Sequence, residues 1–327
     1  MIIVVSLLLG FFWKDSSGSD ATALYQQTPW DKIFALHNTD AQTYWAVGNM
    51  GLILKSTDAA ETWVKMSAGV DEAFNDITFV DKNGWIVGES GLILFTRDGG
   101  SHWEKQSSNT NVTFQKIFFL DNRRGIVVGD AGAVLLTENG GSSWQAYPLD
   151  WTKILPADLV AKGIFAPTLW DVFFTDEAHG WISGDAGVIL FSADGGKTWN
   201  LLKNDLSAPI FSLYFKNALE GFAVGHGGFF GYTEDGGKTW HQQNSFVKEN
   251  LNKIRFSGKK GIVVGNRGTI LQTVDEGKSW VVVNAMLRPP VPWFLDVVIR
   301  ISPKEEVICA GQGGFMKITL SKEDENK

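Results

Sequence analysis

An eight-residue turn ending in tryptophan occurs six times in this chain, and a Gly-x-x-Gly turn occurs seven times. Together they predict an all-β fold, a seven-bladed β-propeller with four antiparallel strands per blade. The six tryptophans lie 40, 41, 55, 41 and 40 residues apart. A period near 40 residues is typical of a repeat architecture in which each repeat forms one blade.

The repeat that ends at Trp199 illustrates the strands expected in every blade. β-branched and aromatic residues fill its apolar runs, and glycine-rich turns separate them. No stretch of comparable length has the 3.6-residue period of a helix. The predicted strands are residues 169–174, 180–183 and 188–192, followed by a fourth that starts at Trp199.

The turn between the second and third strands carries the Gly-x-x-Gly pattern, in which glycine supplies the positive φ that a short hairpin needs. The seven pairs are Gly48/Gly51, Gly88/Gly91, Gly129/Gly132, Gly184/Gly187, Gly225/Gly228, Gly265/Gly268 and Gly311/Gly314. The last pair follows the final tryptophan turn, so the seventh repeat lacks its fourth strand. Residues 24–27 resemble 240–243, and we expect them to pair with residues 315–320 and close the ring.

These boundaries predict one propeller domain over residues 24–320, followed by a charged tail at 321–327. The spacing of 55 indicates an apolar insertion at 145–167, which either packs on the propeller or presents a partner surface. It contains Trp151, Ile154, Leu155, Leu159, Ile164 and Phe165. The expected blades are about 31–67, 74–107, 114–148, 169–203, 210–244, 251–284, and 294–320 completed by 24–28.

Composition limits the classes of function. The net charge of −7 argues against a nucleic-acid binder. A single cysteine, Cys309, excludes an internal disulfide framework, and the five histidines show no metal-ligand spacing, so we expect no cofactor and no metal. Residues 1–23 are apolar and then small and polar, which predicts a signal peptide or membrane anchor and hence an exported protein.

The tryptophan turns resemble the Asp-boxes, or BNR repeats, of sialidases and related propellers; TEDGGKTW, ending at Trp240, is one example. The complete repeat, as in LWDVFFTDEAHGWISGDAGVILFSADGGKTW, resembles the photosystem II assembly and stability factor family. That resemblance covers nearly all of residues 24–320. It implies a non-enzymatic, exported or lumenal seven-bladed propeller that assists the assembly of a membrane complex in photosynthesis.

We interpret the Asp-box residues as structural, because six copies in one array suit a scaffold, whereas catalysis needs one asymmetric site. The Asp or Asn bonds back to backbone amides, and the Trp packs between strands. These residues are Asp58, Trp63, Asp98, Trp103, Asn139, Trp144, Asp194, Trp199, Asp235, Trp240, Asp275 and Trp280.

Two further rings of residues are expected near the axis. The first position inside each Gly-x-x-Gly is polar, which indicates either ordinary turn chemistry or a partner-binding rim. With Trp151 of the insertion, this candidate rim is Asn49, Glu89, Asp130, Asp185, His226, Asn266 and Gln312. The second ring, on the first strands, alternates in charge and predicts inter-blade ion pairs or, alternatively, an ion or ligand site. Its members are Lys32, Asp76, Lys116, Asp171, Ser212, Lys253 and Asp296.

The sequence therefore predicts a monomeric, non-catalytic protein-binding scaffold that docks a polypeptide or membrane-complex partner on the face opposite the Asp-boxes. The expected location is the periplasm, the thylakoid lumen or the cell exterior. The alternative is a sialidase-like glycoside hydrolase or a carbohydrate-binding propeller, which requires arginines or carboxylates gathered around a sugar.

Overall fold

The computed structural model describes residues 25–28, 30–155, 157–161, 163, 165–243, 247–283, 292–300 and 306–319. The predicted signal segment at 1–23 and the charged tail at 321–327 lie outside these residues. The chain folds into seven antiparallel sheets, six with four strands and one with three. This confirms the predicted seven-bladed propeller.

The strands follow the predicted repeat. Blades 1 and 2 contain β1 (Ile33–Asn38), β2 (Tyr44–Gly48), β3 (Ile53–Ser56), β4 (Val64–Met66), β5 (Phe74–Val80), β6 (Asn83–Gly88), β7 (Ile93–Thr96) and β8 (Glu104–Gln106). Blades 3 and 4 contain β9 (Phe114–Phe119), β10 (Gly125–Gly129), β11 (Val134–Thr137), β12 (Gln145–Ala146), β13 (Leu169–Phe174), β14 (Gly180–Gly184), β15 (Ile189–Ser192) and β16 (Asn200–Leu201).

The remaining three blades complete the ring. Blades 5 and 6 contain β17 (Ile210–Phe215), β18 (Gly221–Gly225), β19 (Phe230–Thr233), β20 (His241–Gln242), β21 (Leu251–Ser257), β22 (Lys260–Gly265), β23 (Ile270–Thr273) and β24 (Val281–Val282). Blade 7 contains β25 (Phe294–Arg300), β26 (Glu306–Gly311) and β27 (Gly314–Thr319). The short helices α1 (Trp151–Ile154) and α2 (Ala157–Ala161) lie in the insertion.

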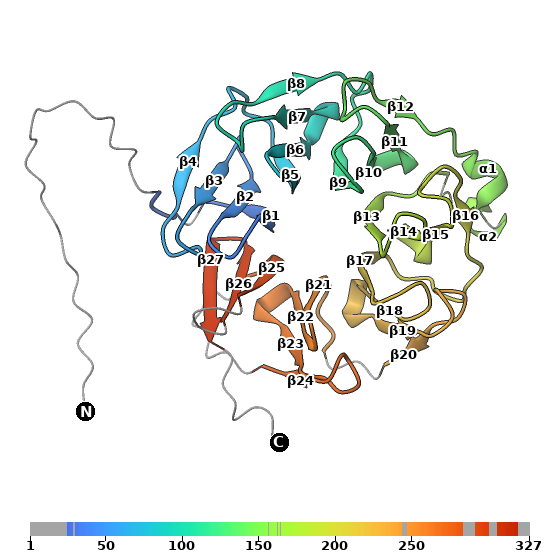
Figure 1. Cartoon of the computed structure of the whole chain (residues 1–327). Coiled ribbons are helices and arrows are strands. Elements are labelled where there is room, and N and C mark those ends of the chain that lie inside the picture. The colour runs from blue at the N-terminus through green and yellow to red at the C-terminus, as the bar shows by residue number, and fades with distance from the viewer. Residues whose placement is uncertain are drawn as a thin grey trace, which may run out of the picture.

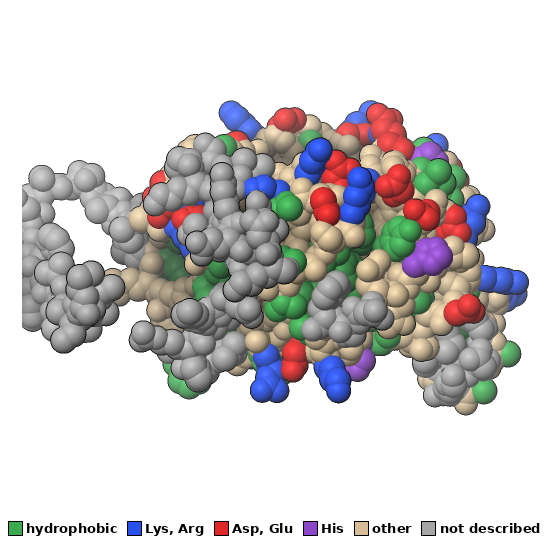
Figure 2. Space-filling model, turned by 90° about the horizontal axis from the view of Figure 1, so that it is seen from below, with side chains coloured by type: hydrophobic (Ala, Val, Ile, Leu, Met, Phe, Trp, Pro, Cys, Tyr) green, Lys and Arg blue, Asp and Glu red, His purple; other side chains and the backbone are tan. Residues whose placement is uncertain are grey.

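The first strand of each blade lies innermost and the fourth lies at the rim (Figure 1). Buried apolar residues fill the spaces between neighbouring blades, so the core is a series of inter-blade clusters. Figure 2 shows the ring edge-on, with acidic and basic side chains intermingled along its edge. The net charge of −7 is thus not concentrated in one acidic patch on this side.

The ring closes between blades 7 and 1, but not through the predicted fourth strand. Blade 7 has three strands among the described residues, and residues 25–28 form none. Instead, the Gln27 side chain donates to the carbonyl of Gly313 and accepts from the N–H of Phe315 at 2.9 Å. A backbone bridge between Lys32 and Gln312 adds to this closure.

Five of the seven Gly-x-x-Gly turns contain a single 3-10 turn, and one residue separates each from the third strand. Their second residue has positive φ in the five that form such turns, including non-glycine residues such as Arg267 at +52°. The turns are η1 (Glu89–Gly91), η2 (Asp130–Gly132), η3 (Asp185–Gly187), η4 (His226–Gly228) and η5 (Asn266–Gly268).

Each Asp-box aspartate uses its carboxylate inside its own turn. In blade 5, the Thr233 hydroxyl donates to Asp235 at 2.9 Å, and the N–H of Gly237 donates to that hydroxyl at 2.9 Å. The N–H of Thr239 donates to the same carboxylate at 2.9 Å. Blade 1 keeps these bonds although Ala59 and Ala60 replace the glycines.

These bonds predict an acid-labile contribution to stability. Burial raises the pKa of Asp235, but the hydrogen bonds from Thr239 and Thr233 outweigh burial and lower the pKa to about 2. Because the folded pKa is depressed, the stabilisation is present above about pH 4 and is lost as the pH falls toward about 2. In urea unfolding at pH 7, the free energy of unfolding should be larger for wild type than for Asp235→Asn. The difference between the two free energies should narrow at about pH 2. A gap independent of pH would contradict this assignment.

Candidate functional site at the axial mouth

A β-bulge at the same place in all seven blades builds the axial mouth opposite the Asp-boxes. The bulge follows the first residue of each innermost strand, as between Phe74 and Asp76 in blade 2. The extra residue leaves the ladder, and its side chain is re-aimed toward the axis. The seven bulge residues are Phe34, Asn75, Gln115, Trp170, Phe211, Asn252 and Leu295.

All seven bulge residues line one cavity of about 410 Å³, which we call the axial mouth. Trp170 and Phe211 form one aromatic side, with ring centroids 5.5 Å apart in an edge-to-face arrangement. Trp293, which is 49% exposed, also lines the cavity. The mouth therefore combines aromatic surface with amide side chains.

The amides at the mouth have fixed orientations. The Asn75 amide nitrogen donates to the Phe114 carbonyl of the next blade at 2.8 Å, and that of Asn252 donates to the Phe294 carbonyl at 2.7 Å. A carbonyl can only accept, so these bonds turn the amide nitrogens toward the next blade and leave the amide oxygens to accept from a ligand. The mouth therefore offers hydrogen-bond acceptors beside aromatic surface.

Several residues of the predicted rim hold the bulge residues in position. Asp130 accepts from Gln115 at 3.0 Å, and Asp185 accepts from the Trp170 indole at 2.8 Å. Asn266 accepts from Asn252 at 2.9 Å and itself lines the mouth. Asn49 instead accepts from the N–H of Lys32 at 2.8 Å. Glu89, His226 and Gln312 are exposed.

Trp151 is not available as a rim residue, contrary to the sequence interpretation. Its side chain is buried, and its indole donates to the Gly132 carbonyl at 3.2 Å. A Cβ on Gly132 would lie 2.0 Å from the indole nitrogen, so this glycine permits the close packing. The insertion thus packs on blade 3 through Trp151 and Leu155, while its Phe165 is exposed.

Below the mouth, three buried aspartates on innermost strands connect neighbouring blades. Each accepts a backbone N–H from the next blade: Asp76 from Ile117 at 3.0 Å, Asp171 from Leu213 at 3.0 Å, and Asp296 from Leu36 at 2.9 Å. Each also meets a cation: Lys116 lies 2.8 Å from Asp76, Lys253 lies 3.3 Å from Asp171, and Arg255 lies 3.3 Å from Asp296. Ser212 donates to Asp171 at 2.9 Å.

Lys32 does not belong to this ring. Ala35 occupies the equivalent register in blade 1, since Ala35 pairs with Val47 as Asp76 pairs with Val87. Lys32 lies before the bulge and is exposed. The predicted contact between Asp296 and Lys32 is therefore replaced by Arg255 and the N–H of Leu36.

Burial and charge set the protonation of these groups. Burial raises the pKa of Asp296, but Arg255 and the two lysines outweigh it and hold the pKa below its usual value. Burial, with the Arg255 and Lys116 charges, lowers the pKa of His37 to about 3. His37 lines a separate cavity of about 260 Å³ with Lys116, Asp171 and Lys253, and it is neutral at ordinary pH.

A model of the family "Photosynthesis system II assembly factor YCF48" matches residues 22–148 and 199–313, which is most of the chain. The chain belongs to the YCF48 family. The expected resemblance to photosystem II assembly factors is confirmed. No curated protein sequence matches the chain significantly.

Solved structures show the same fold as this YCF48-family chain. A YCF48 bound to D1 peptide has a TM-score of 0.71 and 18% identity, with 92% of this chain and 97% of that chain covered. YCF48 from Cyanidioschyzon merolae has a TM-score of 0.70 and 19% identity, covering 93% and 100%. A GH74 xyloglucanase from Xanthomonas campestris has a TM-score of 0.71 and 10% identity, covering 90% and 53%.

Sequence reasoning missed the seven bulge residues of this YCF48-family protein. A signal was present, because they occupy one column of the repeat that mixes aromatic, amide and aliphatic residues and directly follows a column that is uniformly apolar. Among the described residues, no group of histidine, cysteine or acidic side chains is arranged to hold a metal. Neither helix in the described ranges is long and apolar enough to cross a membrane.

Proposed function

We propose that this protein is a non-catalytic scaffold that docks a polypeptide segment of a membrane-associated complex, or of its precursor subunit, in the axial mouth. The observation that carries the proposal is the ring of bulge residues, which offers aromatic surface and acceptor oxygens together. The YCF48 that was solved with D1 peptide supports a polypeptide as the ligand class. Membership of the family supports action on the exported side of a membrane.

An extended polypeptide suits the chemistry of the mouth. Its backbone N–H groups can donate hydrogen bonds to the amide oxygens of Asn75, Gln115 and Asn252. Its apolar side chains pack on Trp170 and Phe211. Trp293, which lines the mouth, and Trp30 are exposed just before innermost strands, and Met50 is exposed in a Gly-x-x-Gly turn, so all three lie on segments at the face where the mouth opens.

The charges at the axis favour this scaffold over the alternative glycoside hydrolase. A hydrolase of the usual kind needs two carboxyl groups free to flank a glycosidic bond. Asp76, Asp171 and Asp296 instead accept backbone N–H groups and meet cations. A hydrolysis screen on sialosides and xyloglucan tests this alternative directly, since turnover would contradict a scaffold.

Trp293→Ala tests the docking site with little risk to the fold, because this side chain is half exposed. Removing an aromatic anchor should weaken binding of a fluorescent D1 peptide about tenfold, as for other interface anchors. Fluorescence anisotropy measures the dissociation constant. Leu219→Ala is the matched control, because Leu219 is 57% exposed in the β17–β18 hairpin on the Asp-box face.

The comparison of these two variants decides the site. Equal affinities of wild type and Trp293→Ala, or a loss confined to Leu219→Ala, would place docking elsewhere than the mouth. Crosslinking from the native membrane fraction, with wild type and Trp293→Ala as baits, then identifies the partner. Capture that is equal with both baits would also contradict the proposed mouth.

A further inference from the structure

A second cavity lies between blades 3 and 4 on the opposite face, and the repeat itself indicates what fits there. The residue three positions before the first glycine of each Gly-x-x-Gly, on the second strand, faces the Asp-box turn of the next blade. In five interfaces that turn contains at least one glycine, and in four of them the facing residue is aromatic. These four are Trp45, Trp85, Trp181 and Phe222; the fifth, between blades 3 and 4, is Ile126.

The aromatic residues make a repeated set of contacts. Trp85 stacks on Phe119 of the next blade with centroids 3.6 Å apart, and its indole donates to the Gly140 carbonyl at 3.1 Å. Trp181 stacks on Phe215 at 3.8 Å and donates to the Gly236 carbonyl at 2.9 Å. Each indole therefore fills the notch between two blades and pairs with the first glycine of the Asp-box.

In blade 3, aliphatic residues stand at both positions of a cross-strand pair that is aromatic in blades 2 and 4. Trp85 pairs with Phe95 and Trp181 with Phe191, whereas Ile126 pairs with Leu136. Ile126 still reaches blade 4, since a Cβ on Gly196 would lie 2.7 Å from its terminal methyl. The smaller side chains leave a cavity of about 250 Å³.

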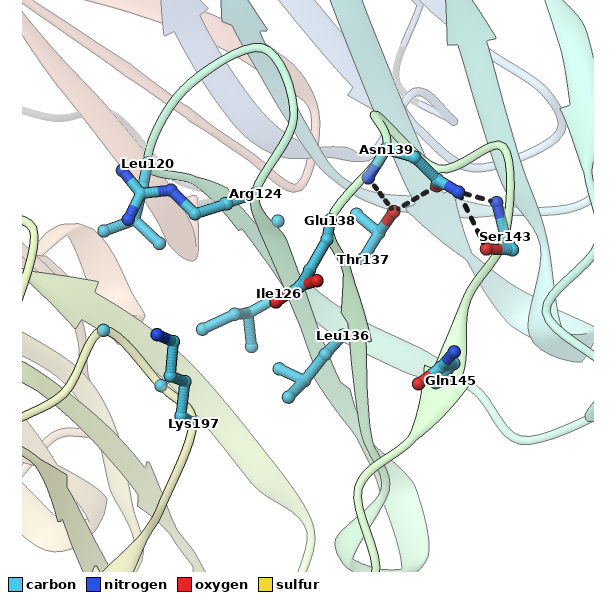
Figure 3. A pocket seen from close by; sticks show the side chains of 13 residues that line it. Leu120, Arg124, Ile126, Leu136, Thr137, Glu138, Asn139, Ser143, Gln145 and Lys197 are labelled. Atoms are coloured by element: carbon cyan, nitrogen blue, oxygen red, sulfur yellow. Dashed lines mark hydrogen bonds between the residues drawn. The ribbon is translucent and has the colours of Figure 1, made fainter.

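The walls of this cavity have the character of an indole site. Leu120, Ile126 and Leu136 form its apolar surface (Figure 3). Gly195 also lines it, at the Asp-box position where Gly140 and Gly236 accept an indole N–H. Arg124 and Lys197 lie across the opening from Glu138, and cations of this kind stabilise an aromatic ring.

We propose that the notch between blades 3 and 4 binds the indole of a tryptophan side chain from a polypeptide partner. The partner's ring takes the place that Trp85 and Trp181 occupy in their own interfaces, and its N–H pairs with the Gly195 carbonyl. The site is independent of docking at the axial mouth, because it lies on the Asp-box side and shares no lining residue with the mouth.

Ligand-observed NMR with N-acetyl-tryptophanamide on the full chain tests the site. Wild type should show saturable binding, and N-acetyl-phenylalaninamide should bind more weakly because it has no indole N–H. Ile126→Trp supplies the ring from within, so it should abolish saturable binding and raise the melting temperature. Ile126→Val leaves the notch open and should retain binding.

Leu136→Phe is a second way to close the notch, because Phe95 and Phe191 hold the equivalent position in blades 2 and 4. It replaces Ile126→Trp in the test if that variant fails to fold. The proposed notch is supported if a folded Ile126→Trp or Leu136→Phe variant loses binding of N-acetyl-tryptophanamide while Trp293→Ala binds it as wild type does. No saturable binding to wild type, or equal binding to wild type and both filling variants, overturns it. Loss in Trp293→Ala alone would assign the indole to the axial mouth and also overturns it.

Discussion

Replacing Arg300 with Met should lower the free energy of unfolding by about 3–5 kcal/mol, because it removes one member of a buried ionic cluster. The Arg300 side chain is only 3% exposed. It donates to the Ala59 carbonyl at 2.6 Å and to Glu61 at 2.8 Å, both in blade 1, and it also pairs with Glu306 of its own blade. Met leaves Glu306, which is 11% exposed, without its cation.

Two variants separate this effect from a general loss of charge. Arg97→Met removes an exposed pair with Glu104 and should cost under about 1 kcal/mol. Arg300→Met with Glu306→Leu removes both buried charges, so it should recover part of the loss. Urea unfolding followed by tryptophan fluorescence and circular dichroism measures all three. If Arg300→Met lost no more free energy of unfolding than Arg97→Met, Arg300 would not stabilise the contact between blades 7 and 1.

Arg300 also shows why the closure of the ring could not be predicted in full. The repeat fixes local turns, since each Asp-box carries its own hydroxyl and its own Asp or Asn acceptor, and hence blade number and strand bounds follow. Blade 7, where the ring closes onto blade 1, has no Asp-box, and long-range contacts take its place. Arg300 reaches blade 1, and Gln27 reaches Gly313 and Phe315. No local pattern specifies such contacts.

The axial site was partly predictable for a related reason. Polar residues in the Gly-x-x-Gly turns are visible in the sequence, and Asp130 and Asp185 do lie beside the mouth. A β-bulge shifts the register by one residue without changing the apolar pattern, however. Lys32 has the sequence context of Asp76, because each directly precedes an isoleucine, but the strand register gives that place to Ala35, three residues later. The one-residue bulge also concealed the bulge residues.

The aspartates below the mouth give the second large expected effect, because they connect blades through the backbone. Asp171 is 2% exposed and accepts from Ser212 and from the N–H of Leu213 in blade 5, while Lys253 approaches it from blade 6. One carboxylate thus connects three successive innermost strands. Burial lowers the pKa of Lys253, and the Asp171 charge opposes this.

Asp171→Lys should therefore destabilise the fold by about 3–5 kcal/mol or prevent folding, since it buries a second cation beside Lys253 and leaves the Leu213 N–H without its acceptor. Asp171→Asn keeps an acceptor oxygen and should cost less. Melting temperature and the urea midpoint check both variants. If Asp171→Lys melted at the wild-type temperature, the aspartate would not hold the blades together, and its burial beside Lys253 would then point to an ion or ligand site at the axis.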